Sequence, residues 1–141
     1  MTQPPSRFTG GLHSPEANAA ECAGLSRLFL ALRGALQEAI ARTGGRALAA
    51  EFELRLETYA GEHAWHALTG LPNLEALRGR VPDIDYRMLL SVYQDYSGFA
   101  RQLAGRLLGD QLLRSVLRSA CLKLPPELAE RNAHTTLIPY A

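Results

Sequence analysis

One short segment groups the residue types that bind metals, Glu62-His63-Ala64-Trp65-His66. On a helix, side chains three or four positions apart share a face, so either Glu62 or His63 can bind a metal ion or haem iron together with His66. The order H-E-x-x-H of zinc proteases is absent, and so is the paired E-x-x-H pattern of di-metal bundles. The competing interpretation is a pair of helix-end histidines beside a Trp65 that fills the core. We therefore predict no cofactor, and we keep Glu62, His63, Trp65 and His66 as candidates for binding a small ligand, haem or a metal.

A second candidate site is basic. Residues 86–124 carry six basic and two acidic side chains, whereas residues 47–75 carry five acids and one Arg. The guanidinium group suits forked contacts with phosphate or carboxylate. Arg101, Arg114 and Arg118 are therefore candidates for binding anions or nucleic acid. The alternative is that the acidic and basic segments pair with each other, within the chain or between copies.

Catalytic motifs are scarce. The sequence contains no G-x-S-x-G elbow, no phosphate-binding glycine loop and no C-x-x-C pair. Cys22 and Cys121 fall on or near apolar stripes, where thiols usually act as small hydrophobic groups. Two cysteines are too few for a disulfide framework, so we expect a reducing cytoplasm. We predict that the chain is not an enzyme.

Hydrophobic periodicity predicts two long helices that would position these groups. The first begins at Ser14-Pro15-Glu16, where Ser14 can cap and Pro15 suits the first turn, and it ends near Thr43-Gly44-Gly45. The second begins at Asp83 or Asp85 and breaks at Gly109, and an apolar face then continues to Pro125-Pro126. Residues 47–60 are ambiguous, because their alternating charges also fit a strand. We predict a helix there, since no partner strand is visible.

Aromatic residues follow one face of the second long helix: Tyr86, Tyr93, Tyr96 and Phe99. Their spacing predicts core packing. Because buried tyrosine hydroxyls need hydrogen-bond partners, we expect these rings at an edge or an interface of the bundle rather than at its centre.

The two long helices align when the chain is shifted by 64 residues. The informative identities are the non-apolar ones, namely Gly34 with Gly98, Arg42 with Arg106, and Gly45 with Gly109. Apolar matches carry little weight, because any two amphipathic helices share them. The pattern predicts an internal repeat of residues 25–52 and 89–116, each a helix, a structural glycine (Gly45 or Gly109) and a second helix.

Length and composition indicate the class of protein. With 141 residues, 47% hydrophobic side chains and a net charge of +1, the chain is one ordinary folded domain. No apolar run is long enough to span a membrane. We predict an all-α single-domain bundle of four to six helices over residues 14–126. A flexible leader at 1–13 and a loosely attached tail at 127–141 complete the predicted organisation.

Three functions compete on this basis. The leading hypothesis is a non-enzymatic interaction module, an adaptor or small subunit that self-associates or docks on a larger protein assembly. It follows from apolar stripes that are long for the chain and from the polarised charge. The second is a sensory domain of a bacterial signalling system, binding a small ligand, haem or a metal. The third is a nucleic-acid-binding subunit that uses the Arg-rich face.

Overall fold

The computed structural model describes residues 15–63 and 85–139. Within them it contains five α-helices and no strand: α2 (Pro15–Gly44), α3 (Arg46–Glu62), α6 (Tyr86–Leu108), α7 (Asp110–Leu122) and α8 (Pro126–Thr135). The all-α prediction is confirmed, and so is the helical interpretation of residues 47–60. The predicted leader at 1–13 and the segment around Trp65 lie outside the described residues.

The sequence signals for helix ends act as expected. Pro15 is the first residue of α2, and the Asp85 carboxylate caps α6 by accepting a hydrogen bond of 3.2 Å from the Met88 amide. Gly45 and Gly109 each break the chain between two helices, with φ of 94° and 89°. Combined with their extended ψ angles of 174° and 155°, this conformation is essentially restricted to glycine.

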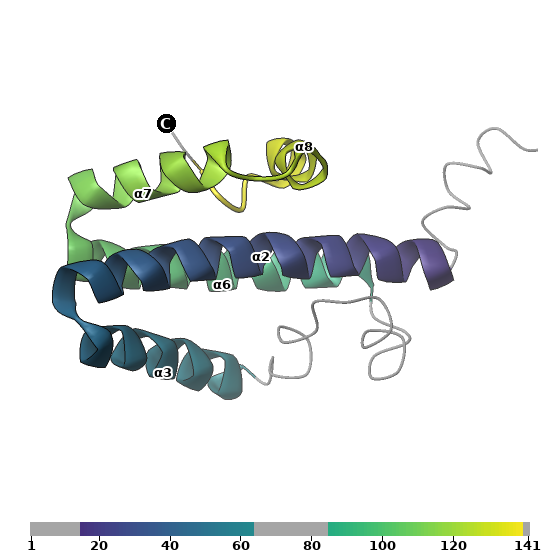
Figure 1. Ribbon diagram of the computed structural model, residues 1–141. Helices are drawn as coiled ribbons and strands as arrows, with labels where there is room; N and C mark the ends of the chain where they lie inside the picture. Colours follow the sequence, from purple (N-terminus) through teal and green to yellow (C-terminus); the bar gives the residue numbers. More distant parts are fainter. Residues whose placement is uncertain (1–14, 64–84, 140–141) are drawn as a thin grey trace, which may run out of the picture.

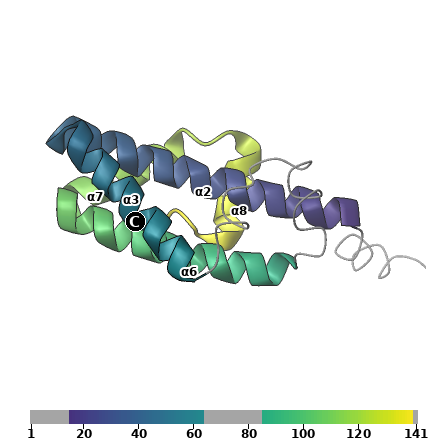
Figure 2. The ribbon, with the colours of Figure 1, turned by 90° about the horizontal axis from the view of Figure 1, so that it is seen from below.

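The helices form three layers. α2 and α6 lie side by side and run in the same direction, as Figures 1 and 2 show. α3 turns back at Gly45 and packs against one side of this pair, whereas α7 turns back at Gly109 and packs against the other side (Figure 1). α8 lies on the same side as α7 but runs across α2 and α6. α3 and α7 thus occupy opposite sides of the central pair.

The core lies where α2 meets α6. The ring of Phe29 on α2 packs against Tyr96 and Tyr93 on α6, with ring centroids 4.6 and 5.1 Å apart. Both tyrosines are fully buried, which confirms their core role but not their expected place at an edge. Their hydroxyls find partners inside the protein: Tyr93 pairs with the Ser26 hydroxyl at 2.8 Å, and Tyr96 donates to the Leu56 carbonyl at 2.9 Å.

Residues 127–139 differ from the expected loose tail. They include most of α8, and after it Leu137 and Ile138 are each 1% exposed. The buried Asn132 amide accepts from the Ile138 backbone nitrogen at 2.8 Å and donates to the Ile138 carbonyl at 2.9 Å. A single polar side chain therefore replaces the backbone partners that this irregular segment lacks. Arg131 adds an ion pair of 2.6 Å with Glu21 of α2.

Candidate functional site: a groove between α2 and α7

The metal-ligand candidates are only partly described. Glu62 and His63 lie at the end of α3 and are both exposed. The Nδ1 atom of His63 is 2.9 Å from the Tyr59 carbonyl, and its ring lies 4.3 Å from the Tyr59 ring. Trp65 and His66 lie outside the described residues. Across residues 15–63 and 85–139 no three metal-ligating side chains come together.

The three arginine candidates lie on two neighbouring helices. Arg114 and Arg118 are exposed on α7, whereas Arg101 on α6 is partly buried. Burial lowers the pKa of Arg101, and its Nε atom is buried without a hydrogen-bond partner. No ion pair joins any of these three side chains to another described residue.

The acidic segment does not neutralise them in the described parts of the chain. Glu53 and Glu57 of α3 bind Arg33 of α2, with distances of 2.8 Å from the Arg33 Nε to Glu53 and 3.0 Å from its terminal nitrogen to Glu57. Glu51 pairs with Arg55 on the same helix at 2.9 Å. Glu51, Glu53 and Glu57 thus bind arginines on the α3 side of the bundle, on the opposite side from α7.

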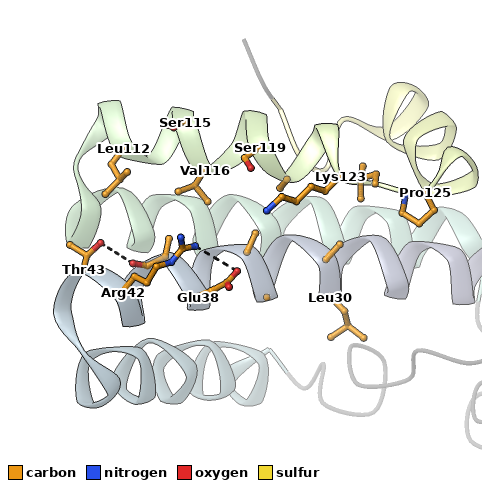
Figure 3. A pocket seen from close by; sticks show the side chains of 16 residues that line it. Leu30, Glu38, Arg42, Thr43, Leu112, Ser115, Val116, Ser119, Lys123 and Pro125 are labelled. Carbon is orange, nitrogen blue, oxygen red and sulfur yellow. Dashed lines mark hydrogen bonds and ion pairs between the residues drawn. The ribbon is translucent and has the colours of Figure 1, made fainter.

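A groove of about 570 Å³ lies between α2 and α7. We call it the α2–α7 groove. Figure 3 shows α2 forming one wall and α7 the other. The lining residues are Leu30, Ala31, Gly34, Ala35, Glu38, Ala39, Arg42, Thr43, Leu112, Ser115, Val116, Ser119, Ala120, Lys123, Leu124 and Pro125.

The groove combines an apolar lining with charged groups. Small residues of α2, among them Ala31, Gly34 and Ala35, leave its space open. Arg42 and Glu38 form a loose pair at 3.7 Å, and Lys123 extends from the end of α7 with its ammonium group between α7 and α2 (Figure 3). Such a surface can bind a molecule that is apolar on one side and carries negative charge at its border.

A second cavity, of about 420 Å³, lies on the other flank of α7, where that helix meets α6. Arg101, Arg106 and Gln102 line it, together with Asp110 and two glycines of α6. α7 therefore lies between two cavities, each with cationic side chains. On the exposed face of α7, Arg114 and Arg118 add two more positive charges.

Sequence reasoning did not single out the groove. A usable signal was present in the shifted alignment, where Gly34-Ala35 falls opposite Gly98-Phe99. The first pair leaves space along the apolar stripe, whereas the second pair contributes a ring. Arg101 was singled out, and the structure places it beside the second cavity rather than in the groove.

Comparison with protein-family models, with curated proteins and with solved structures finds no match for this chain. None of the described helices is long and apolar enough to cross a membrane.

Proposed function

We propose that this chain is a non-enzymatic interaction module whose α2–α7 groove binds an amphipathic helix of a protein partner, with acidic residues on the helix's polar face. The observation that carries the proposal is an open, apolar groove with two cations at its border. Arg42 pairs with Glu38, whereas Lys123 has no carboxylate partner among the described residues. Helix-in-groove recognition places apolar anchors in the groove and leaves the polar face at the rim.

The dimensions support a helical occupant. From Leu30 to Thr43 the α2 wall spans about 20 Å at 1.5 Å per residue, which matches roughly 13 residues of a bound helix. Leu30 and Leu112 are 36% and 39% exposed at the groove. Covering two large apolar side chains in water favours association.

Charge supports an acidic occupant. Around α7 six cations face two acids: Arg42, Arg101, Arg106, Arg114, Arg118 and Lys123 against Glu38 and Asp110. An acidic partner would be steered toward this face, and the attraction would weaken with salt. A twofold contact of this face with the same face of a second copy would bring like charges together. We therefore propose a different protein as the partner.

A synthetic peptide tests this function. The peptide is a helix of about 16 residues with Leu at one face and Glu at the other, labelled for fluorescence anisotropy. A matched peptide carries Lys in place of every Glu. We expect the acidic peptide to bind and to weaken at high salt, and the basic peptide to bind at least about tenfold less tightly.

Two chain variants locate the binding. Ala35→Phe places a ring in the groove and should reduce the affinity for the acidic peptide by at least about tenfold. Ala50→Phe adds the same ring to an exposed position on α3 and should leave the affinity unchanged. Equal binding of acidic and basic peptides, or equal effects of the two variants, would overturn the proposal.

The same unpaired cations favour a second candidate, a nucleic-acid-binding subunit that uses Arg101, Arg114 and Arg118. Phosphate contacts release counterions, so such binding falls steeply with salt concentration. A duplex oligonucleotide titrated over a salt series tests it. Oligonucleotide binding that Arg114→Gln with Arg118→Gln abolishes, and that Ala35→Phe leaves unchanged, would place this candidate first.

A further inference from the structure

The chain bends identically at two places 64 residues apart. The Gly45 nitrogen donates to the Ala41 carbonyl at 2.9 Å, and the Gly109 nitrogen donates to the Gly105 carbonyl at 2.8 Å. On the other side of each break, the Ala49 nitrogen bonds the Gly45 carbonyl at 3.2 Å, and the Leu113 nitrogen bonds the Gly109 carbonyl at 3.0 Å. Every donor and acceptor is displaced by 64 positions. Residues related by this shift therefore hold corresponding places around the two breaks.

The shift assigns a counterpart to the α2–α7 groove. It relates α2 to α6 and α7 to α3, so the counterpart is the cleft between α6 and α3. That cleft exists, with a volume of about 370 Å³, and its lining includes Glu51, Arg55, Tyr59 and Phe99. The corresponding residues at 115, 119, 123 and 35 line the α2–α7 groove, whereas the counterparts of the cleft's three other lining residues, Leu54, Thr58 and Glu62, do not.

An aromatic pair of the chain itself occupies part of the α3–α6 cleft. The rings of Phe99 and Tyr59 stack with centroids 3.9 Å apart and an interplanar angle of 7°. The Tyr59 hydroxyl donates to the Asp95 carboxylate at 2.7 Å, and Glu51 pairs with Arg55 at the rim. The chain therefore supplies both an aromatic filling and its polar partners on this side.

The α2–α7 groove lacks that filling. Ala35 stands where the cleft has Phe99, Lys123 stands where it has Tyr59, and Ala31 stands where it has Asp95. Small hydroxyl residues, Ser115 and Ser119, replace the Glu51–Arg55 pair. The groove is larger than its counterpart, about 570 against 370 Å³, and at all five of these positions its side chain is the smaller one.

We propose that the partner anchors itself with an aromatic side chain that enters the groove beside Ala35 and lies against Lys123. This inference rests on the proposed function and adds the chemistry of the anchor. The ring would occupy the space that corresponds to the Phe99 ring. The Lys123 ammonium would contact the ring face, because an ammonium near an aromatic face is attracted by its electron density.

Three acidic peptides that differ at one position test the inference. Their central anchor is Phe, Leu or Ala, and the rest of the helix is unchanged. We expect the Phe peptide to bind at least about threefold more tightly than the Leu peptide, and the Ala peptide to bind most weakly. A Leu peptide that binds as tightly as the Phe peptide would overturn the aromatic anchor and leave the groove function standing. If no peptide of the three binds, the proposed function itself fails.

Two variants assign the preference to the named residues. Lys123→Met keeps a long apolar side chain but removes the charge, so it should reduce the Phe-to-Leu affinity ratio by about twofold or more. Ala35→Leu occupies part of the ring space and should remove the preference for Phe altogether. For both variants the quantity compared is the ratio of the affinities for the Phe and Leu peptides. A variant that weakens both peptides equally leaves this ratio unchanged. An unchanged ratio in both variants would overturn the proposed place of the ring.

Discussion

At the scale of residues, the molecule buries several titratable groups in their neutral forms. The thiol of Cys22 is fully buried, and desolvation, followed by the nearby charges of Asp85 and Glu21, raises its pKa from 9.0 to about 11. Desolvation also raises the pKa of Tyr96 from 10.0 to about 12. Each group favours the folded state as long as it stays protonated.

This burial predicts a loss of stability in alkali. The contribution of Cys22 is fully present below pH 9, the value for an exposed thiol, and it is lost as the pH rises toward 11. The free energy of unfolding should fall by at most about 1.4 kcal/mol per pH unit for each such group. Urea unfolding at a series of pH values between 8 and 10.5 measures this fall in the free energy of unfolding. Cys22→Ala lacks this thiol, so its decline between pH 9 and 11 should be shallower than that of the parent protein; the part that remains there belongs to Cys121, whose pKa burial also raises.

The partly buried ion pairs of Arg33 predict a second effect. The Arg33 and Glu53 side chains are 18% and 23% exposed, so removing one of them leaves the other with an unbalanced charge. We expect Arg33→Met to cost about 1–3 kcal/mol in urea unfolding, and the double variant with Glu53→Leu to recover at least half of that loss.

The chain offers a matched control for that experiment. Arg55 pairs with Glu51 at 2.9 Å, but the two side chains are 56% and 54% exposed. Arg55→Met should therefore change the free energy of unfolding by no more than about 0.5 kcal/mol. A comparable loss for Arg55→Met and Arg33→Met would show that burial does not decide the strength of these pairs.

Sequence spacing predicted which residues are apolar core but not how polar side chains are satisfied inside it. Tyr93 and Tyr96 were expected at an edge because their hydroxyls need partners, and those partners proved to be Ser26 and a backbone carbonyl of α3. Such contacts join residues 67 and 40 positions apart, and no local pattern encodes them. For the same reason the pairing of Arg33 with Glu53 and Glu57 was not predicted.

At the scale of elements, two glycines decide where α3 and α7 leave the long helices. Their positive φ and extended ψ are strained for any residue with a side chain. We expect Gly45→Ala and Gly109→Ala each to lower the free energy of unfolding by about 1–3 kcal/mol. Gly34→Ala is the control, because Gly34 lies within α2 and an added Cβ has no atom within 4 Å. It should stabilise the protein by up to about 1 kcal/mol, and destabilisation there would contradict this explanation.

The last segment of the described chain depends on Asn132. Asn132→Ala removes both hydrogen bonds to Ile138. The buried Ile138 amide is then unpaired and its carbonyl keeps only the Cys121 thiol as a donor, at 3.4 Å, which costs about 1–3 kcal/mol. The Ile138 amide should then exchange with deuterium much faster than in the parent protein. His134→Ala changes an exposed residue of the same helix and should leave this exchange unchanged. Unaltered exchange in Asn132→Ala would mean that the apolar contacts of Leu137 and Ile138 suffice.

Helix boundaries were the most predictable elements. Residues that cap or break a helix act on the backbone next to them, so the sequence alone indicates where helices end. The examples are Pro15, Asp85, Gly45 and Gly109. The segment after Pro126 was less predictable, because a short helix and two apolar residues do not reveal that Asn132 holds them in the core.

At the scale of the whole molecule, two helix–glycine–helix units, α2–α3 and α6–α7, pack together through α2 and α6. The two sides of this central pair differ in how much of the space beside it is occupied. On the α3–α6 side Phe99 and Tyr59 occupy part of the cleft, and three acids of α3 bind arginines. The α2–α7 side keeps an open groove and unpaired cations. This asymmetry underlies the proposed function.

A backbone amide map of peptide binding locates the binding surface on the protein. The acidic Phe-anchored peptide is titrated into ¹⁵N-labelled protein, and amide shifts are followed by nuclear magnetic resonance. We predict that the largest shifts fall on residues 30–43 of α2 and on residues 112–125, which include most of α7 and the three residues after it. Shifts on α3 should be small. Shifts centred on α3, or spread evenly over the helices, would contradict the α2–α7 groove as the binding site.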